Sequence, residues 1–373
     1  MAKLERYTSK VGFPVACIGV TSSNQVMLGG GGGPGRSGVQ NKLVVYSMSD
    51  SGLQQQSELV LNSDEDAPTC LAIHPKEKAV VASINGTGED IQKGSNRNLR
   101  QFTLTKSRIR AGKTTKTICS SDQLDYQKCV RFSSSGSMVA GGATDGTLAV
   151  LKYPSLKPVT SFIDAADEVN DVDFGEKDKW LVAATDSEIK VLLAADSSTV
   201  KSIRDPHTVS GERAVFRFAR FGAKTPNVLF TVLNTRSRKS CYIVQWNTQT
   251  WSRVSTRSIA HSAATTFAMS HKGDLLALAT ASLQICICDA HTLKVLLRVP
   301  AAHSFAITAL AFDKDDKRLI SASADETCQV IVLPETWPTA IDRLSAYAQD
   351  HIRILAVILI GILAILIALF TRK

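Results

Sequence analysis

The sequence lacks the short motifs on which covalent enzymes depend. It has no G-x-S-x-G nucleophile elbow, no H-E-x-x-H zinc motif and no protein-kinase motif set. It also has no G-x-G-x-x-G that follows an expected strand and opens a helix. These absences argue against hydrolase, metalloprotease, kinase and dinucleotide chemistry. They favour a binding scaffold without covalent catalysis.

Paired cysteines are missing as well. The chain has 8 cysteines and none forms a C-x-x-C pair. Because these thiols are scattered through apolar segments expected to be strands, buried cysteines in a reducing compartment fit better than a zinc site or a disulfide framework. The first residues are charged and form no apolar signal segment. We therefore expect the main domain to lie in the cytosol.

The charge balance is basic but not concentrated. Lys and Arg number 43 against 34 Asp and Glu, and no long basic run gathers the excess. A mildly basic solvated surface explains this balance better than a nucleic-acid site does. We expect neither a nucleic-acid partner nor a small-molecule substrate.

The C-terminal segment Ile354 to Phe370 is apolar without interruption. Its 17 residues are long enough for a bilayer helix and carry no polar stripe, which a buried soluble helix would show. The predicted organisation is a cytosolic domain over 1–335, a juxtamembrane linker over 336–353, a membrane helix over 354–371 and a short luminal tail over 372–373. A helix of this length suits the thin bilayer of the endoplasmic reticulum.

Short apolar segments recur along the domain and predict an all-β propeller. Each recurring unit opens with an alternating strand, and the openings follow at spacings of roughly 40 to 60 residues, which is typical of one four-stranded sheet per blade. The seven predicted openings are Val15–Val20, Cys70–His74, Val130–Ser133, Val169–Phe174, Val215–Phe221, Ala264–Ser270 and Ile307–Asp313.

The last unit is one strand short, and a spare segment precedes the first. Pairing of Leu4–Lys10 with the last unit would close the ring and remove two exposed sheet edges. The pattern resembles WD-repeat propellers, although Ala302-His303 stands where Gly-His is usual and no Trp-Asp closes a blade. We expect His303 and Asp325 to form a structural hydrogen-bonded pair.

The run from Gly29 to Asn41, GGGGGPGRSGVQN, stands between two expected strands of the first unit. Gly30, Gly35, Arg36 and Ser37 nearly match a phosphate-binding loop. A strand rather than a helix is expected to follow, however, so no helix N-terminus would face a phosphate. The acidic segment Asp64-Glu65-Asp66 looks like solvated loop charge, and the polar insert Asn85–Asn98 is expected beside the glycine run.

This combination resembles the endoplasmic reticulum membrane guanine nucleotide exchange factors that start COPII coat assembly, the family of prolactin regulatory element-binding protein. The resemblance is carried by the glycine run, by Gly38-Val39 and by Asn41 entering the next strand. It implies a single-pass membrane protein whose glycine loop binds a potassium ion and opens the nucleotide pocket of the small GTPase of the COPII coat. A related plant branch departs in the loop, and retention of Gly38, Val39 and Asn41 favours the exchanging branch.

The resemblance also implies roles for individual residues. Val39, expected to be exposed near the loop tip, is the candidate wedge, with a tucked-in core residue as the alternative. Asn41 would either tie the end of the loop or supply an oxygen to the ion. Gly38, Arg36 and Pro75 are candidate partner contacts. The candidate potassium residues are Gly29, Gly30, Gly31, Gly32, Gly33 and Asn41.

A second hypothesis keeps the same fold without exchange activity. The chain would then be an adaptor that helps particular membrane cargo leave the endoplasmic reticulum. It would bind the GTPase or the cargo without accelerating nucleotide release.

Overall fold

The computed structural model describes residues 4–337, apart from 36, 50–51, 106–107, 205–207, 210, 224 and 226. By internal contacts, Arg6–Val332 form one compact unit, and the remaining terminal residues form another. The predicted linker, membrane helix and luminal tail lie outside the described residues from residue 338 onward. Within the described part of the chain, no helix is both long and apolar enough to cross a membrane.

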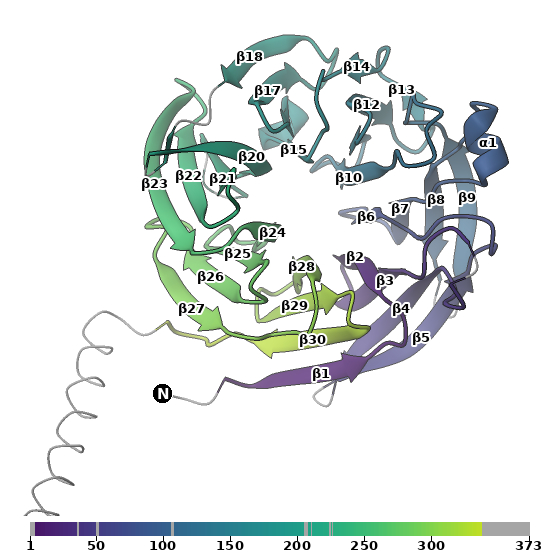
Figure 1. Ribbon diagram of the computed structural model, residues 1–373, viewed down its shortest axis with the longest axis horizontal. Coiled ribbons are helices and arrows are strands. Elements are labelled where there is room, and N and C mark those ends of the chain that lie inside the picture. Colours follow the sequence, from purple (N-terminus) through teal and green to yellow (C-terminus); the bar gives the residue numbers. More distant parts are fainter. Residues whose placement is uncertain are drawn as a thin grey trace, which may run out of the picture. The chain divides into compact units, whose positions relative to one another are not determined.

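Arg6–Val332 form seven antiparallel sheets arranged in a ring (Figure 1), which confirms the predicted seven-bladed propeller. The first blade contains β2 (Val15–Val20), β3 (Gln25–Gly30), β4 (Lys42–Ser49) and β5 (Gly52–Val60). The second contains β6 (Cys70–Ile73), β7 (Ala79–Ser83), β8 (Leu99–Leu104) and β9 (Ile109–Thr115). The third contains β10 (Gln127–Phe132), β11 (Met138–Ala143), β12 (Thr147–Lys152), β13 (Lys157–Pro158) and β14 (Ile163–Asp164). The fourth strand of the third blade is thus broken into two short pieces that both pair with β12.

The other four blades follow the same order. The fourth blade contains β15 (Asp171–Phe174), β16 (Trp180–Ala184), β17 (Glu188–Leu193) and β18 (Thr199–Arg204), and the fifth contains β19 (Thr208–Val209), β20 (Glu212–Phe221), β21 (Val228–Thr235), β22 (Cys241–Asn247) and β23 (Ser252–Ala260). The sixth contains β24 (Ala264–Met269), β25 (Leu275–Thr280), β26 (Ile285–Asp289) and β27 (Val295–Val299). The seventh contains β28 (Ile307–Phe312), β29 (Arg318–Ser323), β30 (Thr327–Val332) and β1 (Arg6–Lys10). Among the described residues, two short helices interrupt the strands, α1 (Gly88–Gln92) and the 3-10 turn Glu176–Asp178.

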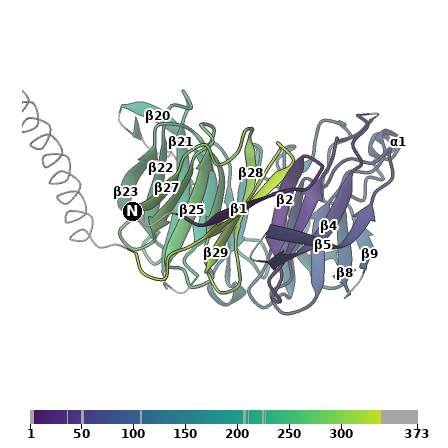
Figure 2. The ribbon, with the colours of Figure 1, turned by 90° about the horizontal axis from the view of Figure 1, so that it is seen from below.

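The ring is closed by the N-terminal strand, as the sequence predicts. β1 pairs antiparallel with β30, with Arg6 opposite Ile331 and Lys10 opposite Thr327. Figure 2 shows β1 crossing the edge of the seventh blade. The Gln329 amide also donates to Thr8 Oγ1 over 3.1 Å. The two ends of the unit therefore share one sheet, and neither leaves an unpaired edge there.

Neighbouring blades are joined near the centre by side chains that donate to a carbonyl of the next blade. At least one such bond lies at each junction around the ring. The donors and acceptor oxygens are Thr308 to Val15 (2.6 Å), Cys17 to Pro68 (3.7 Å), Thr69 to Gln127 (2.8 Å), Cys129 to Val169 (3.9 Å), Asn170 to Phe216 (3.1 Å), Asn234 to Ala264 (3.0 Å) and Thr265 to Ile307 (2.9 Å). Most cysteines are buried as predicted, whereas Cys119 is exposed.

The predicted pair of His303 and Asp325 is present in the seventh blade. The His303 ring lies 3.4 Å from the Asp325 carboxylate and contacts the hydroxyls of Thr327 and Ser321 at 2.8 Å each. Asp325 also accepts from the backbone N–H of Ser304. Because burial outweighs the nearby carboxylate, the pKa of His303 is lowered. The pair has a structural role, because it connects the loop before β28 to the turn between β29 and β30.

Candidate functional site: the glycine loop of the first blade

The glycine run joins β3 to β4, as the sequence predicts. Its first two members belong to the strand, because Gly29 pairs with Leu43 and Gly30 pairs with Lys42 in the ladder. The glycine loop proper is therefore residues 31–41. A strand follows it rather than a helix. Because no helix begins after the loop, the helix dipole that a phosphate-binding loop needs is missing.

The side chain of Asn41 ties the end of the loop to its beginning. Its Oδ1 accepts from the N–H of Gly33 at 3.0 Å, and its Nδ2 donates to the carbonyl of Gly33 at 2.9 Å. The same Nδ2 donates to the carbonyl of Glu65 at 2.8 Å. Asn41 is 5% exposed, so these bonds are shielded from water. The first of its two predicted roles, tying the loop, is thus the one that the structure displays.

Only glycine fits at the position that faces Asn41. Gly31 has φ +146°, and a Cβ there would lie 2.3 Å from Asn41 Oδ1 and 2.8 Å from the carbonyl oxygen of Gln40. Gly33 also has a positive φ of 80°, with room around it. Any side chain at residue 31 would push the two arms of the loop apart.

Oxygen atoms gather on the glycine side of the loop. The position of a Cβ on Gly32 would lie 1.8 Å from Ser37 Oγ and 3.1 Å from the carbonyl oxygen of Val39. With the Gln40 carbonyl and Asn41 Oδ1 beside Gly31, four oxygens approach two neighbouring glycines. Oxygen donors of this kind suit hard or alkali cations. Among the described residues no group of three or more His, Cys, Asp or Glu side chains is placed to share a metal ion.

Val39 is half-buried rather than exposed at the tip, so the predicted exposure is wrong. It packs against the core cluster that contains Phe13 and Val15, and its N–H donates to Ser37 Oγ at 3.2 Å. That cluster combines side chains of the first and seventh blades, and they cover part of the Val39 side chain. Gly38 is exposed with φ +81°. Arg36 lies outside the described residues.

The acidic segment after the first blade lies beside the loop and is not simply solvated. Glu65 forms an ion pair with Arg100 at 2.9 Å, and both side chains are largely covered. Burial raises the pKa of Asp66, whose Oδ1 would lie 3.7 Å from a Cβ on Gly33. The position of the acidic segment beside the glycine loop could have been predicted from propeller topology, because the loops after the second and fourth strands of a blade lie on the same face.

The polar insert Asn85–Asn98, which was predicted beside the glycine run, contacts the acidic segment. The N–H of Asp66 donates to the carbonyl of Asn85 at 3.1 Å. The insert contains α1, whose first turn is capped by Thr87 Oγ1 accepting from the N–H of Asp90. The loop, the acidic segment and the insert form one continuous surface, which we call the glycine-loop face.

Pro75 lies on the opposite face of the ring. It is exposed in the turn after β6. The other end of β6 faces the glycine loop, because Pro68, just before Cys70 at the start of the strand, lies against Gly29. The far end of β6 instead faces the far end of β2, where a Cβ on Gly19 would meet Ile73. Pro75 therefore sits at the other end of the strand from the glycine loop, and its role as a partner contact stays a prediction.

Comparisons with known proteins agree with the architecture and indicate the family. Residues 294–331 match the WD40 family (WD domain, G-beta repeat). The chain is 27% identical over 313 residues to SEC12-like protein 2 of Arabidopsis thaliana, covering 81% of this chain and 74% of the relative. It is 25% identical over 341 residues to guanine nucleotide-exchange factor SEC12 of Candida glabrata, covering 87% and 72%.

The chain is a homologue of the SEC12 proteins. The mouse guanine nucleotide-exchange factor SEC12 is also similar, with 27% identity over 228 residues that cover 56% of this chain and 55% of the relative. The matches to SEC12-like protein 2 of Arabidopsis thaliana and to SEC12 of Candida glabrata are each longer than 300 residues, so they span most of the propeller. The likeness thus extends well beyond a single WD repeat.

Proposed function

We propose that this chain is a guanine nucleotide-exchange factor that promotes GDP release from the small GTPase initiating COPII coat assembly. The proposal rests on homology to named exchange factors over most of the chain. It rests equally on the glycine loop, whose conformation is fixed by the Asn41 tie. Catalysis here needs no covalent chemistry, because the exchange factor has only to stabilise the nucleotide-free partner.

A loop built in this way suits insertion at another protein's nucleotide site. Gly35, Ser37 and Gly38 are exposed and carry no bulky apolar side chain, so a partner can approach the backbone closely at these residues. The tie at Asn41 keeps the loop ordered before binding, which lowers the entropy cost of association. Val39 would act as the wedge only through the part of its side chain that is not packed on the blade.

The oxygens around Gly31 and Gly32 are the candidate ligands for a potassium ion. The ion would be held by the carbonyls of Val39 and Gln40, by Ser37 Oγ and by Asn41 Oδ1. When bound, it would supply positive charge that holds together the oxygens of residues 37–41, which face Gly31 and Gly32.

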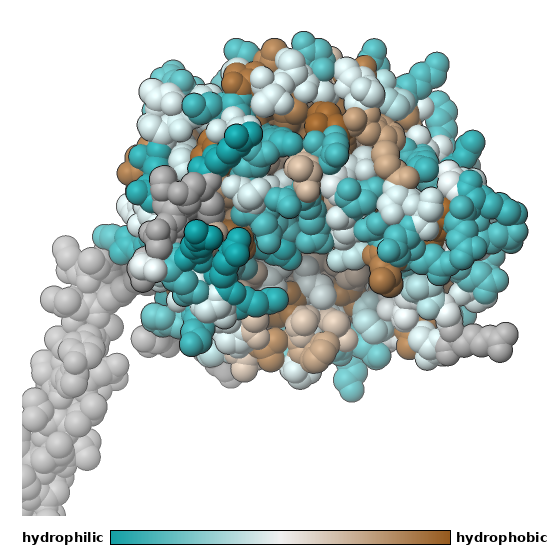
Figure 3. Space-filling view, turned by 45° about the horizontal axis from the view of Figure 1, so that its top comes forward, coloured by the Kyte–Doolittle hydropathy of each residue, from teal (hydrophilic) through white to brown (hydrophobic). Residues whose placement is uncertain are grey.

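The side of the ring that carries the glycine-loop face also has exposed apolar side chains that could anchor a protein partner. Leu124 is 84% exposed and Phe305 is 64% exposed, and both lie in loops that lead into the first strand of a blade, as the acidic segment does. Figure 3 shows a surface that is mostly hydrophilic with small separate apolar patches. Such isolated anchors on a polar surface are typical of interfaces that form and dissociate.

Membrane attachment is part of the proposal. The segment 354–371 would anchor the chain in the endoplasmic reticulum with the propeller in the cytosol, and residues 372–373 would be luminal. Val332, the last residue of β30, pairs with Arg318 at the edge opposite the glycine loop. The last residue of β30 therefore lies on the face opposite the glycine loop.

The test is nucleotide release from the purified GTPase by the full chain reconstituted in liposomes. We expect the chain to accelerate GDP release many-fold at catalytic concentrations. The alternative is the cargo adaptor, which two relatives named only SEC12-like keep open. An adaptor would bind the GTPase in a pull-down yet leave the release rate unchanged, and that result would overturn the exchange proposal.

A further inference from the structure

Leu124 has the largest exposed fraction of the large apolar side chains in the described part of the chain, at 84%. It stands at the third position of a β-turn, in which the N–H of Asp125 donates to the carbonyl of Asp122 at 3.2 Å. The Asp122 side chain also accepts from the N–H of Leu124 at 2.9 Å. Single exposed leucines are common on protein surfaces, so exposure alone identifies no site. The surroundings of Leu124 distinguish it from such residues.

The loop that carries this leucine, residues 119–126, is held at both ends, and we call it the Leu124 loop. Near its start, the Asp145 carboxylate accepts from the N–H of Cys119 at 2.8 Å. Near its end, Thr144 Oγ1 donates to the carboxylate of Asp125 at 2.7 Å. Both partners belong to the turn between β11 and β12. The apolar side chain is therefore presented on a shaped turn, and a partner that covers it has little loop entropy to remove.

The Leu124 loop adjoins the glycine-loop face. Asn85 Nδ2 donates to the carbonyl of Asp125 at 2.8 Å, and the carbonyl of Asn85 accepts from the N–H of Asp66 at 3.1 Å. The start of α1 also lies against the Leu124 loop, because a Cβ on Gly88 would be 3.0 Å from Gln123 Nε2. The polar insert thus connects the Leu124 loop to the acidic segment, and the acidic segment is bonded in turn to the glycine loop.

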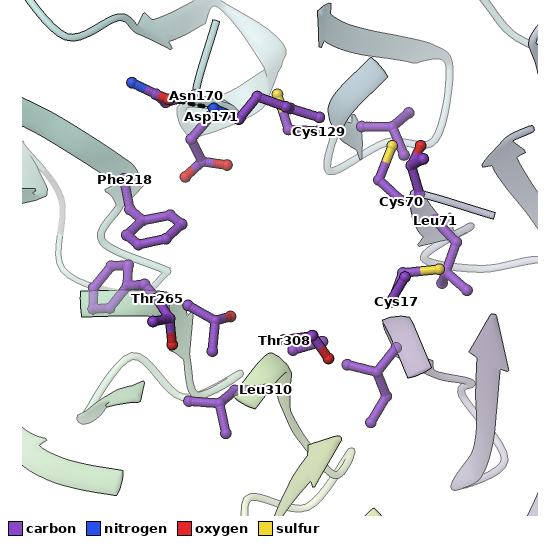
Figure 4. Close-up of a pocket in the computed structure, with 18 of the residues that line it drawn as sticks. Cys17, Cys70, Leu71, Cys129, Asn170, Asp171, Phe218, Thr265, Thr308 and Leu310 are labelled. Carbon is purple, nitrogen blue, oxygen red and sulfur yellow. Dashed lines mark hydrogen bonds between the residues drawn. The ribbon is translucent and has the colours of Figure 1, made fainter. Parts of the chain in front are cut away.

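The inner strands show the same order of the first three blades. The acidic segment leads into β6, and the Leu124 loop leads into β10. Figure 4 shows Cys70 of β6 between Cys17 of β2 and Cys129 of β10 on the wall of the central cavity. An interface of standard size takes in about 20 to 30 residues of each partner. One protein partner can therefore contact both the glycine loop and the Leu124 loop.

Acidic side chains outnumber basic ones around this surface. Seven acidic and three basic residues lie in the segments 61–69, 85–98 and 116–126. Asp145 adds one carboxylate, while Arg36 of the glycine loop and Arg100, which pairs with Glu65, add two cations. The total is eight acidic against five basic groups, on a chain that carries a net charge of +9. A partner that covers Leu124 thus meets an acidic border, which favours Lys or Arg around its own apolar contact.

We infer that the Leu124 loop is a second docking contact for the small GTPase, receiving an apolar patch of that protein bordered by Lys or Arg side chains. The inference rests on the proposed exchange function, because it names a further surface for the same partner. Burial of the leucine adds affinity, and the acidic border speeds encounter with a basic surface. Since nucleotide release is assigned to the glycine loop, the Leu124 loop sets the KM for the GTPase and not the kcat of exchange.

The test is nucleotide exchange by the full chain in liposomes, measured over a range of GTPase concentrations with the wild type and Leu124→Ser. We expect the KM for the GTPase to rise roughly ten-fold in the variant while kcat stays within about two-fold, because burial of a leucine is worth at least about a decade of affinity. The matched control is Val254→Ser, which removes a side chain that is 60% exposed on β23 of the fifth blade. It should keep the wild-type KM and kcat.

The charge of the border is tested separately by Asp122→Asn. An asparagine retains the side-chain oxygen that accepts from the N–H of Leu124, so the turn is kept while one negative charge is removed. We expect a KM several-fold above that of the wild type at low ionic strength, and a smaller difference at high ionic strength, where charges are screened. A KM in Asp122→Asn that equals the wild-type value at every salt concentration would contradict the acidic border.

Equal KM values for the wild type and Leu124→Ser, or a loss confined to kcat, would overturn the docking inference while leaving exchange intact. If the wild type binds the GTPase without accelerating release, the exchange proposal fails, and equilibrium affinity then decides the docking inference. Roughly ten-fold weaker binding by Leu124→Ser would support it, and unchanged affinity would overturn it. Absence of GTPase binding by the wild type, including the case in which Leu124→Ser loses only cargo binding, would overturn both proposals.

Discussion

The side-chain amide of Asn41 forms two reciprocal hydrogen bonds with the backbone of Gly33, eight residues earlier in the chain. An amide that both accepts and donates in this way replaces a pair of ladder hydrogen bonds. It extends the pairing of β3 and β4 by one step beyond Gly30 and Lys42. The loop is thereby shaped before any partner arrives.

The conformation of the loop depends on the absence of a side chain at residue 31. We predict that Gly31→Ala lowers the exchange rate at least roughly ten-fold, because its Cβ would displace Asn41 Oδ1. Gly35→Ala is the matched control. Gly35 also has a positive φ, of 116°, but nothing lies within 4 Å of its Cβ position, so only backbone strain of about 1 kcal/mol is added.

Nucleotide release by the two variants, measured under identical conditions, checks this prediction. The wild-type rate in Gly31→Ala would show that the contact with Asn41 does not govern the loop. A large loss in Gly35→Ala alone would shift the important position to the tip.

The cation proposal predicts faster exchange in potassium than in sodium at equal ionic strength. We expect a several-fold difference, because the smaller sodium ion would fit the same carbonyl oxygens less well. Asn41→Ala should abolish the difference, since it removes one of the candidate ligands. Release rates measured in the two salts provide the check, and equal rates for the wild type would remove the ion from the account while leaving exchange intact.

Ring closure by β1 predicts a loss of stability when that strand is removed. Deletion of residues 1–10 breaks the pairing of five residues with β30, so we expect unfolding to be easier by roughly 3 kcal/mol and the protein to associate through the open edge. The control variant Arg6→Ala/Lys10→Ala changes two exposed side chains and keeps the backbone pairing. Thermal unfolding and light scattering after size exclusion distinguish the two. A monodisperse deletion variant with the wild-type midpoint would contradict the role of β1.

The buried His303 predicts a pH dependence of stability. Its pKa is lower in the folded than in the unfolded protein, so the folded state binds the proton more weakly. Stability is therefore present above the unfolded pKa of about 6.5 and is lost as the pH falls below it, by at most about 1.4 kcal/mol per pH unit. Thermal midpoints between pH 7.5 and 5.5 should decrease in the wild type.

The thermal midpoint should depend less steeply on pH in His303→Gln, because glutamine cannot titrate. That variant should nevertheless be less stable than the wild type at every pH. His261 stands at the corresponding place of the sixth blade but is exposed, so His261→Gln should keep the wild-type slope. Equal slopes in all three proteins would show that other groups cause the dependence.

Strand periodicity was sufficient to predict the seven blades and their closure. Each opening strand alternates because one face packs on the next blade, and the missing last strand is visible as a broken pattern after Val332. The position of Pro75 was not predictable from its neighbours alone, since it depends on which end of β6 faces the loop. The partial burial of Val39 depends on a cluster that residues of two blades form together, which the local sequence does not reveal.

The central claim is that the ordered glycine loop promotes nucleotide release. It is tested most directly by the rate of GDP release with the wild type, Asn41→Ala and Asn234→Ala compared side by side. Asn234 makes the same reciprocal pair of bonds, to the N–H and carbonyl of Ala264, in a distant blade. Both variants should lose a similar stability of roughly 1–3 kcal/mol. We predict a large loss of exchange in Asn41→Ala and near wild-type exchange in Asn234→Ala, whereas equal rates in the two variants would contradict the claim.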